Sequence, residues 1–266
     1  MTPDDHIKAA TALDQAEQTR QQIGCFSQDF AAMTMADAYG IQNAWVDIKL
    51  AADRRILGRK IGLTSRAMQQ QLGIDIPDSG ILFDDMFFET ECVIPNNRFI
   101  EPRVEAEIAF IMGEDLKASD ASPADVLRAT EYVAPALEIL DTRIYRLDPI
   151  TKRTRSVLDT ISDNAANAGI VLGRERHPVQ DVDLPWVGAI LHLNGHVEET
   201  GLGAGVLGDP LESMAWLARR LAEHGDYIRR GEVVLSGSFI RAVEAPSGAR
   251  FHADFGSFGS VSCSFK

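Results

Sequence analysis

The chain has 266 residues, of which 45% are hydrophobic and 24% are charged, a composition typical of a globular protein with a sizeable core. Its 26 basic and 39 acidic residues give a formal net charge of −13, so its overall charge repels nucleic acid and anionic membranes. Its first residues lack the apolar core of a secretory signal, no apolar run approaches the roughly 20 residues that span a bilayer, and its three cysteines are scattered, so we expect a soluble cytoplasmic protein.

Helices are predicted in the first part of the chain. Residues 5–24 are polar with recurring Ala, Leu and Ile, which predicts a helix. Thr34 and Asp37 stand three apart, as in a capping box, and predict the start of a second helix. Apolar residues then recur at helical spacing and predict one buried stripe, made of Ala38, Ile41, Trp45 and Ile48. We therefore expect a small helical N-terminal part over 1–56 and a single β-rich body over 57–266.

Strand patterns open the body, beginning with ILGRKIGLTS, which predicts a strand that runs into a turn. Gly, Pro and Asp punctuate residues 73–90 and predict a loop followed by a strand. Pro102 precedes a strongly alternating strand, RVEAEIAFIM. Ser122 before Pro123 predicts the start of a helix over 122–133, after which EYVAPALEILDTR returns to β character.

The second half of the body begins with polar, irregular residues, 145–168, which we interpret as a mobile loop or lid. Short strands are expected over 182–187 and 189–193, and Asn194-Gly195 predicts a hairpin turn. Asp209-Pro210 predicts the start of a helix with an apolar stripe, which ends at Gly225; the residues after it predict several strands. The whole pattern predicts an α+β fold.

Paired carboxylates stand in one of the apolar strands. Glu105 and Glu107 are two apart, so their side chains point to the same face, and their neighbours predict a largely buried strand. Like charges there repel each other and resist loss of water, and a hard divalent cation suits such oxygen ligands. Glu138, in the apolar run APALEIL, offers a third carboxylate. The alternative is that the pair lines a solvated strand face.

Two further positions are candidates for acid–base chemistry. Lys60 lies in an apolar segment next to Gly62, where a lysine near a metal-bound carbonyl can stabilise an enolate or move a proton; the alternative is a surface lysine at the start of a strand. Asp78 stands in Pro-Asp-Ser-Gly, where it is either catalytic or a turn former, and Asp84 and Asp85 follow on the other side of the predicted strand.

Other motifs predict no site. The segment 203–208 matches GxGxxG, but it follows an exposed-looking hairpin and its helix begins only after Asp209, so it does not predict a dinucleotide site. His192 and His196 flank a hairpin turn, which does not give the zinc geometry of a helical pair. The sequence contains no GxSxG, no P-loop and no Cys-x-x-Cys.

These residues together resemble a known family. The chain is similar over essentially its whole length to the 2-oxopent-4-enoate hydratase group of the fumarylacetoacetate hydrolase superfamily. The similar blocks occur in order, and they are GRKIGLTSRAM (58–68), PDSGILFDDMFF (77–88), PRVEAEIAF (102–110), YVAPALEILDTR (132–143), DTISDNAANAG (159–169), EETGLGAGVLGDPLESMAWLA (198–218) and GSFGSVSCSF (256–265).

The resemblance implies a β-roll-like catalytic body that holds one Mg²⁺ or Mn²⁺. The family's metal ligands correspond to Glu105, Glu107 and Glu138, and its KxG lysine corresponds to Lys60. The glycine-rich segment at 201–208 is a motif of the family and is not a nucleotide site there. The family also implies a homo-oligomer and a small-molecule substrate.

The implied reaction is the hydration of a 2-oxo-enoic acid, first of all 2-oxo-hept-4-ene-1,7-dioate to 4-hydroxy-2-oxoheptanedioate in aromatic catabolism. Asp78 is the expected acid–base group, with Asp84 positioning it. The resemblance places Gly62, Arg143, Ser162 and Ser238 among the substrate-binding residues, and Arg143, Arg153 or Arg155 is expected to contact the distal carboxylate.

Three alternatives stay open. A 2-oxo-3-hexenedioate (4-oxalocrotonate) decarboxylase shares the metal site, but such enzymes carry an apolar residue at the position of Asp78, which favours hydration here. A shorter 2-oxopent-4-enoate is the alternative substrate. Ser79 stands where the family usually has an aromatic residue, and this departure leaves the exact substrate open. A hydrolase of acylpyruvates or a non-catalytic partner subunit is also conceivable; no His–Glu dyad supports the first, and the intact glutamates and Lys60 argue against the second.

Overall fold

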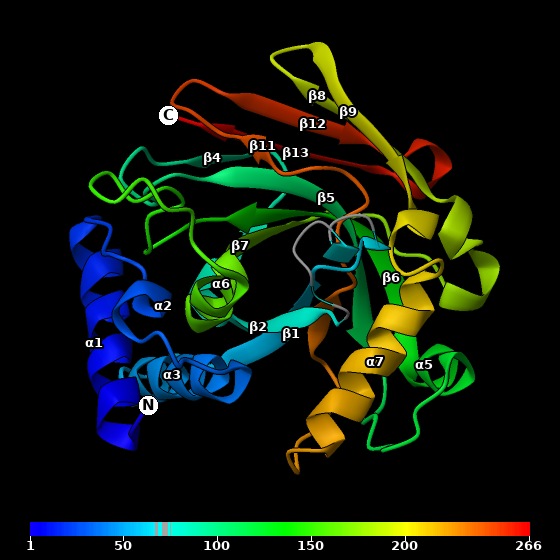
Figure 1. Cartoon of the computed structure of the whole chain (residues 1–266). Coiled ribbons are helices and arrows are strands. Elements are labelled where there is room, and N and C mark those ends of the chain that lie inside the picture. Colours follow the sequence, from blue (N-terminus) through cyan, green and yellow to red (C-terminus); the bar gives the residue numbers. More distant parts are fainter. Residues whose placement is uncertain (67–68, 71–73, 75) are drawn as a thin grey trace.

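Two β-sheets form the body of the chain, and helices flank the larger of them (Figure 1). This computed structural model describes residues 1–66, 69–70, 74 and 76–266. Residues 73 and 75 of the loop predicted over 73–90, and residues 67–68 of the block 58–68, therefore lie outside the described residues. The predicted α+β class is confirmed, with a small helical part at the N-terminus.

The eight-stranded sheet has the order β2-β1-β10-β5-β6-β7-β3, with β11 paired to β5. β5 pairs antiparallel with β6, which pairs antiparallel with β7, while β1 runs parallel to β10. The strands of this sheet are β1 (Ile56–Gly62), β2 (Asp78–Phe83), β3 (Phe87–Glu89), β5 (Arg103–Met112), β6 (Thr130–Leu140), β7 (Asn167–Leu172), β10 (Val233–Leu235) and β11 (Val243–Glu244).

A five-stranded sheet of order β4-β13-β12-β8-β9 lies alongside β5, β6 and β7 and completes the body (Figure 1). Its strands are β4 (Cys92–Ile94), β8 (Gly188–Leu193), β9 (His196–Leu202), β12 (Arg250–Asp254) and β13 (Ser260–Phe265). Asn194 and Gly195, both with positive φ, form the predicted turn between β8 and β9.

Reciprocal caps start four of the helices: a Ser or Thr accepts from the backbone N–H three residues on, and an Asp at that position accepts from the cap. The predicted cap of Thr34 and Asp37 is one of them. The helices are α1 (Pro3–Thr19), α2 (Phe26–Asp29), α3 (Met35–Ala51), α5 (Pro123–Ala129), α6 (Val157–Ser162) and α7 (Pro210–Ala222). In the part of the chain that the structure describes, none of them is long and apolar enough to cross a membrane.

Three element predictions are wrong in part. The segment 145–168 is irregular only at first, because Ser156 and Asp159 cap α6 and buried residues of β7 follow it. No strand forms over 182–187, because Pro185 has no N–H to donate to a strand ladder. A 3-10 turn occupies 184–186 instead, and another one precedes it at 179–181. The helix predicted over 122–133 ends at Ala129, because the chain from Thr130 onward pairs with β5.

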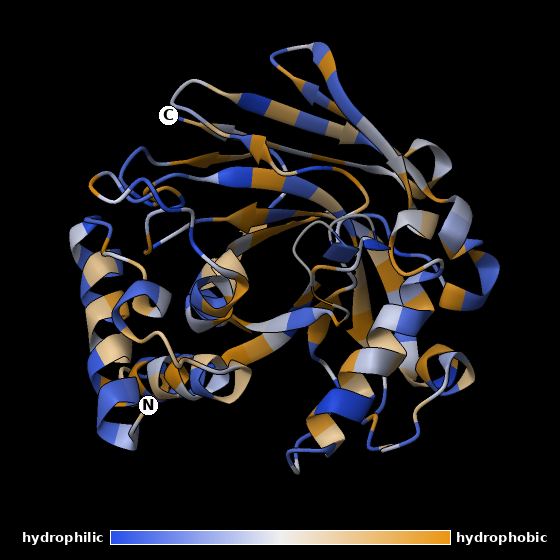
Figure 2. Cartoon of the chain, in the orientation of Figure 1, coloured by the Kyte–Doolittle hydropathy of each residue, from blue (hydrophilic) through white to orange (hydrophobic). Residues whose placement is uncertain are grey.

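Two buried clusters hold these layers together. One joins β5 and β6 to the smaller sheet and α7, through residues such as Ile108, Val261 and Met214. The other joins α1 and α3 to the opposite side of the larger sheet, where Trp45 packs edge-on to Phe83 with ring centroids 5.7 Å apart. Much of β6 and β7 is coloured as hydrophobic in Figure 2. The division of the chain at residue 56 stays a prediction.

Candidate active site

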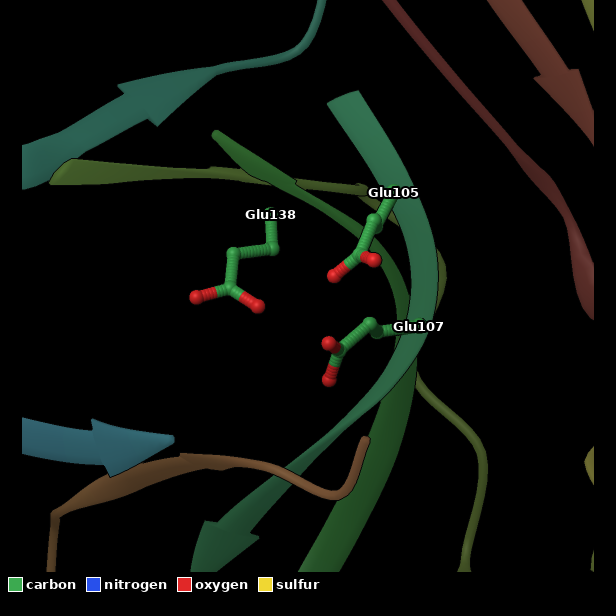
Figure 3. A group of neighbouring side chains, drawn as sticks. All are labelled: Glu105, Glu107 and Glu138. Carbon is green, nitrogen blue, oxygen red and sulfur yellow. The ribbon is translucent and has the colours of Figure 1, made fainter. Parts of the chain in front are cut away.

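Three glutamates converge on the inner face of the β5–β6 pair. Glu105 and Glu107 alternate with buried residues of β5, as predicted, and Glu105 is the direct cross-strand partner of Glu138 on β6. Carboxylate oxygens of all three lie within 4.8 Å of one another. Figure 3 shows the three side chains pointing toward a common region. The antiparallel register, and not only the spacing of two residues, therefore builds the cluster.

The negative charge of the cluster is only partly compensated by other groups among the described residues. Glu107 and Glu138 are fully buried, and Glu107 Oε1 and both carboxylate oxygens of Glu138 accept no hydrogen bond there. Burial and the charge of Glu138 raise the pKa of Glu105 to about 8, and burial with both neighbouring glutamates raises the pKa of Glu107 strongly. Unpartnered buried oxygens of this kind suit a hard divalent cation, so the donor set fits Mg²⁺ or Mn²⁺.

Lys60 and Asp78 lie beside the glutamates. Lys60 Nζ is 3.4 Å from Glu138 Oε1, and both side chains are buried. Burial alone lowers the pKa of Lys60, but the charges of Glu138 and Asp78 outweigh it and raise that pKa, so the lysine carries its charge. Asp78 is 2% exposed and its Oδ1 has no hydrogen-bond partner among the described residues. Burial, and then the charge of Glu138, raises the pKa of Asp78.

Gly62 explains how the lysine and the aspartate come together. Gly62 on β1 pairs directly with Asp78 on β2, so Asp78 lies in a strand and not in the turn that its neighbours suggested. A Cβ atom on Gly62 would lie 2.2 Å from Asp78 Oδ1 and 2.9 Å from Lys60 Nζ. The glycine therefore leaves room for both polar groups, which lie next to the position that its Cβ would take. Its predicted place at the site is consistent with this geometry, as a spacer.

A cavity of about 700 Å³ opens beside the cluster and is lined by Gly62, Glu105, Glu107 and Ser238, among others. Ser238 Oγ donates to Ile240 O at 2.9 Å, so its hydroxyl shapes the loop after β10. In the same loop the backbone N–H of Gly237 donates to Glu107 Oε2 at 2.8 Å. Gly237 could not be predicted from the sequence, since a single glycine in a strand-rich segment carries no distinctive signal.

Three predicted site residues have partners outside the glutamate cluster. Asp84 forms an ion pair with Arg55 at 3.1 Å and stands past the far end of β2 from Asp78, so it does not position that carboxyl. The buried guanidinium of Arg143 is used within the protein, on the Asp163 carboxylate and on backbone carbonyls. Ser162 is buried in α6 and donates to Leu158 O at 2.8 Å.

The remaining motifs match their predictions. The glycines at 201–208 allow close packing: a Cβ on Gly201 would lie 1.9 Å from Phe239 O, and Leu207 N–H donates to Thr64 O, next to the cavity wall. No buried parallel strand precedes this segment, and α7 starts only after it, so the segment is not a dinucleotide motif. His192 and His196 lie on opposite strands of the exposed β8–β9 hairpin.

Curated relatives match the chain over nearly its full length. It is 48% identical over 260 residues to 2-oxo-hept-4-ene-1,7-dioate hydratase of Escherichia coli, which covers 98% of this chain and 97% of that protein. It is 40% identical over 266 residues to 2-keto-4-pentenoate hydratase of Paraburkholderia xenovorans, covering 100% of this chain and 97% of that protein. No family model matches the chain.

Solved structures share the fold. 4-Oxalocrotonate decarboxylase from Pseudomonas putida G7, complexed with magnesium and adipate, is 33% identical with a TM-score of 0.94 over 100% of this chain and 99% of that one. A fumarylacetoacetate hydrolase family protein from Yersinia pestis is 17% identical with a TM-score of 0.56, over 78% of this chain and 92% of that one, and shows the fold alone.

Proposed function

The chain belongs to the 2-oxopent-4-enoate hydratase family of the fumarylacetoacetate hydrolase superfamily, and from this premise we propose that it is a metal-dependent hydro-lyase. Its proposed reaction is the hydration of 2-oxo-hept-4-ene-1,7-dioate to 4-hydroxy-2-oxoheptanedioate. The relative with 48% identity is named for that substrate. The observation that carries the proposal is the buried cluster of three glutamates with Lys60 and Asp78 beside it.

Glu105, Glu107 and Glu138 are the proposed ligands of Mg²⁺ or Mn²⁺, because their carboxylate oxygens converge and three of the buried ones, Glu107 Oε1 and both of Glu138, accept no hydrogen bond among the described residues. When bound, the cation supplies a Lewis acid for the 2-oxo group of the substrate. The decarboxylase relative, solved with magnesium and adipate, supports a site that takes both a dication and a dicarboxylate. The backbone N–H of Gly237 holds one oxygen of Glu107 and so fixes the orientation of that carboxylate.

Lys60 and Asp78 are the proposed groups that act on the carbon chain. The ammonium of Lys60 stabilises negative charge that develops on the C2 oxygen when a proton leaves C3. Asp78 takes that proton and returns it to C5, which moves the double bond from C4–C5 to C3–C4. Water then adds its oxygen to C4 while C3 regains a proton. The raised pKa of Asp78 suits a group that both takes and returns a proton.

The test is an absorbance assay with Mg²⁺ and 2-oxo-hept-4-ene-1,7-dioate, with the product identified by mass spectrometry. Gain of one water supports the proposal, and loss of activity in excess chelator supports the metal. Glu107→Gln serves as the inactive control, since it removes a proposed ligand. A product that has lost CO₂, or full activity in excess chelator, contradicts the proposal.

A decarboxylase is the second candidate, because the structural relative at TM-score 0.94 is 4-oxalocrotonate decarboxylase. Release of CO₂ from 2-oxo-3-hexenedioate distinguishes it from the hydratase. A third outcome of the same assay is a preference for 2-oxopent-4-enoate, the substrate class named for the relative at 40% identity. The homo-oligomeric state and the cytoplasmic location are likewise proposals. The location is supported by Cys25, Cys92 and Cys263, which are free thiols, as expected in a reducing compartment.

A further inference from the structure

Arg103 continues the row of site residues along β5. It stands two residues before Glu105, so its side chain leaves the strand on the same face as the glutamates. It lines the cavity beside the cluster, and together with Glu244 and Pro246 it also lines a second cavity of about 560 Å³. Arg103 therefore stands at the end of the reaction cavity that lies farther along the strand from the glutamates.

The guanidinium of Arg103 is incompletely satisfied. Its Nε is buried and has no hydrogen-bond partner among the described residues. Its Nη2 lies 3.2 Å from Glu244 Oε1, but the Glu244 side chain is 78% exposed. Such a surface ion pair contributes little and exchanges readily for another carboxylate.

Arg155 adds positive charge at the same end of the strands. Its Nη1 donates to Thr142 Oγ1 at 2.6 Å, and its side chain forms no ion pair within the described ranges. Thr142 follows β6 two residues after Leu140, which is the direct cross-strand partner of Arg103. The charge of Arg155 also opposes the rise in the pKa of Asp78 and lowers the pKa of Arg146, so its guanidinium lies within electrostatic reach of both.

Other arginines near the site are already paired or face solvent. Arg143 is fully used on Asp163 and on backbone carbonyls. Arg241 lines the cavity, but it bonds to both Glu198 and Glu199 on β9. Arg153 is exposed on the loop before α6. Among the sequence candidates for the distal carboxylate, only Arg155 has both the position and a guanidinium without a carboxylate partner in the described structure.

We propose that Arg103, backed by Arg155, receives a second carboxylate at the far end of the substrate and so selects a 2-oxo dioate over a monoacid. This inference rests on the proposed function. Six carbon–carbon bonds that each advance roughly 1.25 Å separate C1 from C7 by about 7.5 Å. Two residues of a strand advance about 6.7 Å, so a chain bound by its 2-oxo acid end at the glutamates places C7 within reach of the Arg103 guanidinium.

The kinetic test compares 2-oxo-hept-4-ene-1,7-dioate with 2-oxopent-4-enoate, which lacks the distal carboxylate. Arg103→Met should lower kcat/KM for the dioate by about 10- to 100-fold, the effect of losing a charge-assisted hydrogen bond, while monoacid hydration changes by less than about threefold. Arg155→Met should act in the same direction, and Arg103→Lys should restore part of the dioate activity. The matched control Arg230→Met, at an exposed arginine on the loop before β10, should leave the hydration of both substrates unchanged.

Glu244→Gln supplies the opposite perturbation. It removes the carboxylate that competes for Arg103, so KM for the dioate should stay the same or fall by about two- to threefold. Monoacid hydration should not respond. A rise in the dioate KM would mean that Glu244 helps to hold the substrate and contradicts the proposed exchange.

A binding measurement separates recognition from turnover and folding. Calorimetry with Mg²⁺ compares 2-oxoheptanedioate with 2-oxopentanoate, saturated analogues that cannot be hydrated. Arg103→Met should weaken only the dioate analogue and leave Mg²⁺ affinity and Tm in place. Equal losses for both analogues, or no loss for either, overturns the role of Arg103. Wild-type protein that binds both analogues but hydrates neither substrate overturns the proposed function and leaves the binding inference standing on the calorimetry.

Discussion

Gly62→Ala tests whether the present placement of Lys60 and Asp78 around Gly62 is required for catalysis. The substitution adds one methyl group and changes no charge. The new Cβ would lie 2.2 Å from Asp78 Oδ1 and 2.9 Å from Lys60 Nζ, whereas real Cβ atoms essentially never approach a heavy atom closer than 3.0 Å. Since Asp78 is the direct strand partner of Gly62, its carboxyl must move away from the new methyl group.

The expected cost follows from the size of this displacement. A catalytic group misplaced by about 1 Å loses about 100-fold in rate, which corresponds to about 2.7 kcal/mol of transition-state stabilisation. We therefore expect kcat/KM for hydration to fall by about 100-fold in Gly62→Ala. Affinity for Mg²⁺ should change little, because the glutamates stand on β5 and β6 and keep their register.

The assay follows loss of substrate absorbance with Mg²⁺, together with calorimetric titration of Mg²⁺ and a thermal melt. Gly188→Ala is the matched control: it also lies in a strand, but its Cβ would meet its nearest neighbour, Leu202 Cδ2, at an ordinary 3.5 Å. A folded Gly62→Ala protein that keeps kcat/KM within about threefold of wild type refutes the reasoning, because it means that the spacing of Lys60 and Asp78 is not critical.

Three further predictions concern the ligands, the acid–base group and the acid limit of stability. Glu107→Gln should abolish metal-dependent turnover and the rise in Tm on adding Mg²⁺ while the metal-free protein stays folded; unchanged Mg²⁺ affinity by calorimetry contradicts the ligand role. Asp78→Asn should lower hydration by at least about 100-fold and keep Mg²⁺ affinity within about threefold, and normal hydration contradicts the acid–base role. Hydrogen bonds from Ser122 and Arg128 lower the pKa of Asp125 from 3.8 to about 2. This contribution to stability is present above about pH 4 and is lost as the pH falls through about 2, so Ser122→Ala should lower Tm by about 2–4 °C at pH 6 and by less at pH 3, as followed by circular dichroism.

The sequence predicted the glutamate pair well because its information is local. Alternation in RVEAEIAFIM fixes both the strand and the shared face of Glu105 and Glu107. Glu138 was predicted from its apolar surroundings and from the family resemblance. Only the register of β5 with β6 shows that it is the cross-strand partner of Glu105.

Residues whose position depends on tertiary pairing were harder to predict. Pro77-Asp78-Ser79-Gly80 has turn composition, yet Asp78 begins a strand because Gly62 pairs with it. Arg143 looks like a substrate ligand in a loop, but Asp163 and the turn before β7 take its guanidinium. The capping signal of Ser156 and Asp159 was present in the sequence and was missed, which is why α6 was interpreted as part of a lid.

The net charge of −13 and an anionic substrate are compatible because the two act at different ranges. Surface charges are screened beyond about 8 Å at physiological ionic strength, whereas buried groups keep most of their mutual interaction. Three of the acidic side chains converge at a site that suits a dication, and Lys60 and Arg103 stand on either side of them. A dianion therefore encounters local positive charge at both ends of the proposed site. This arrangement depends on strand register, so total charge carries no information about it.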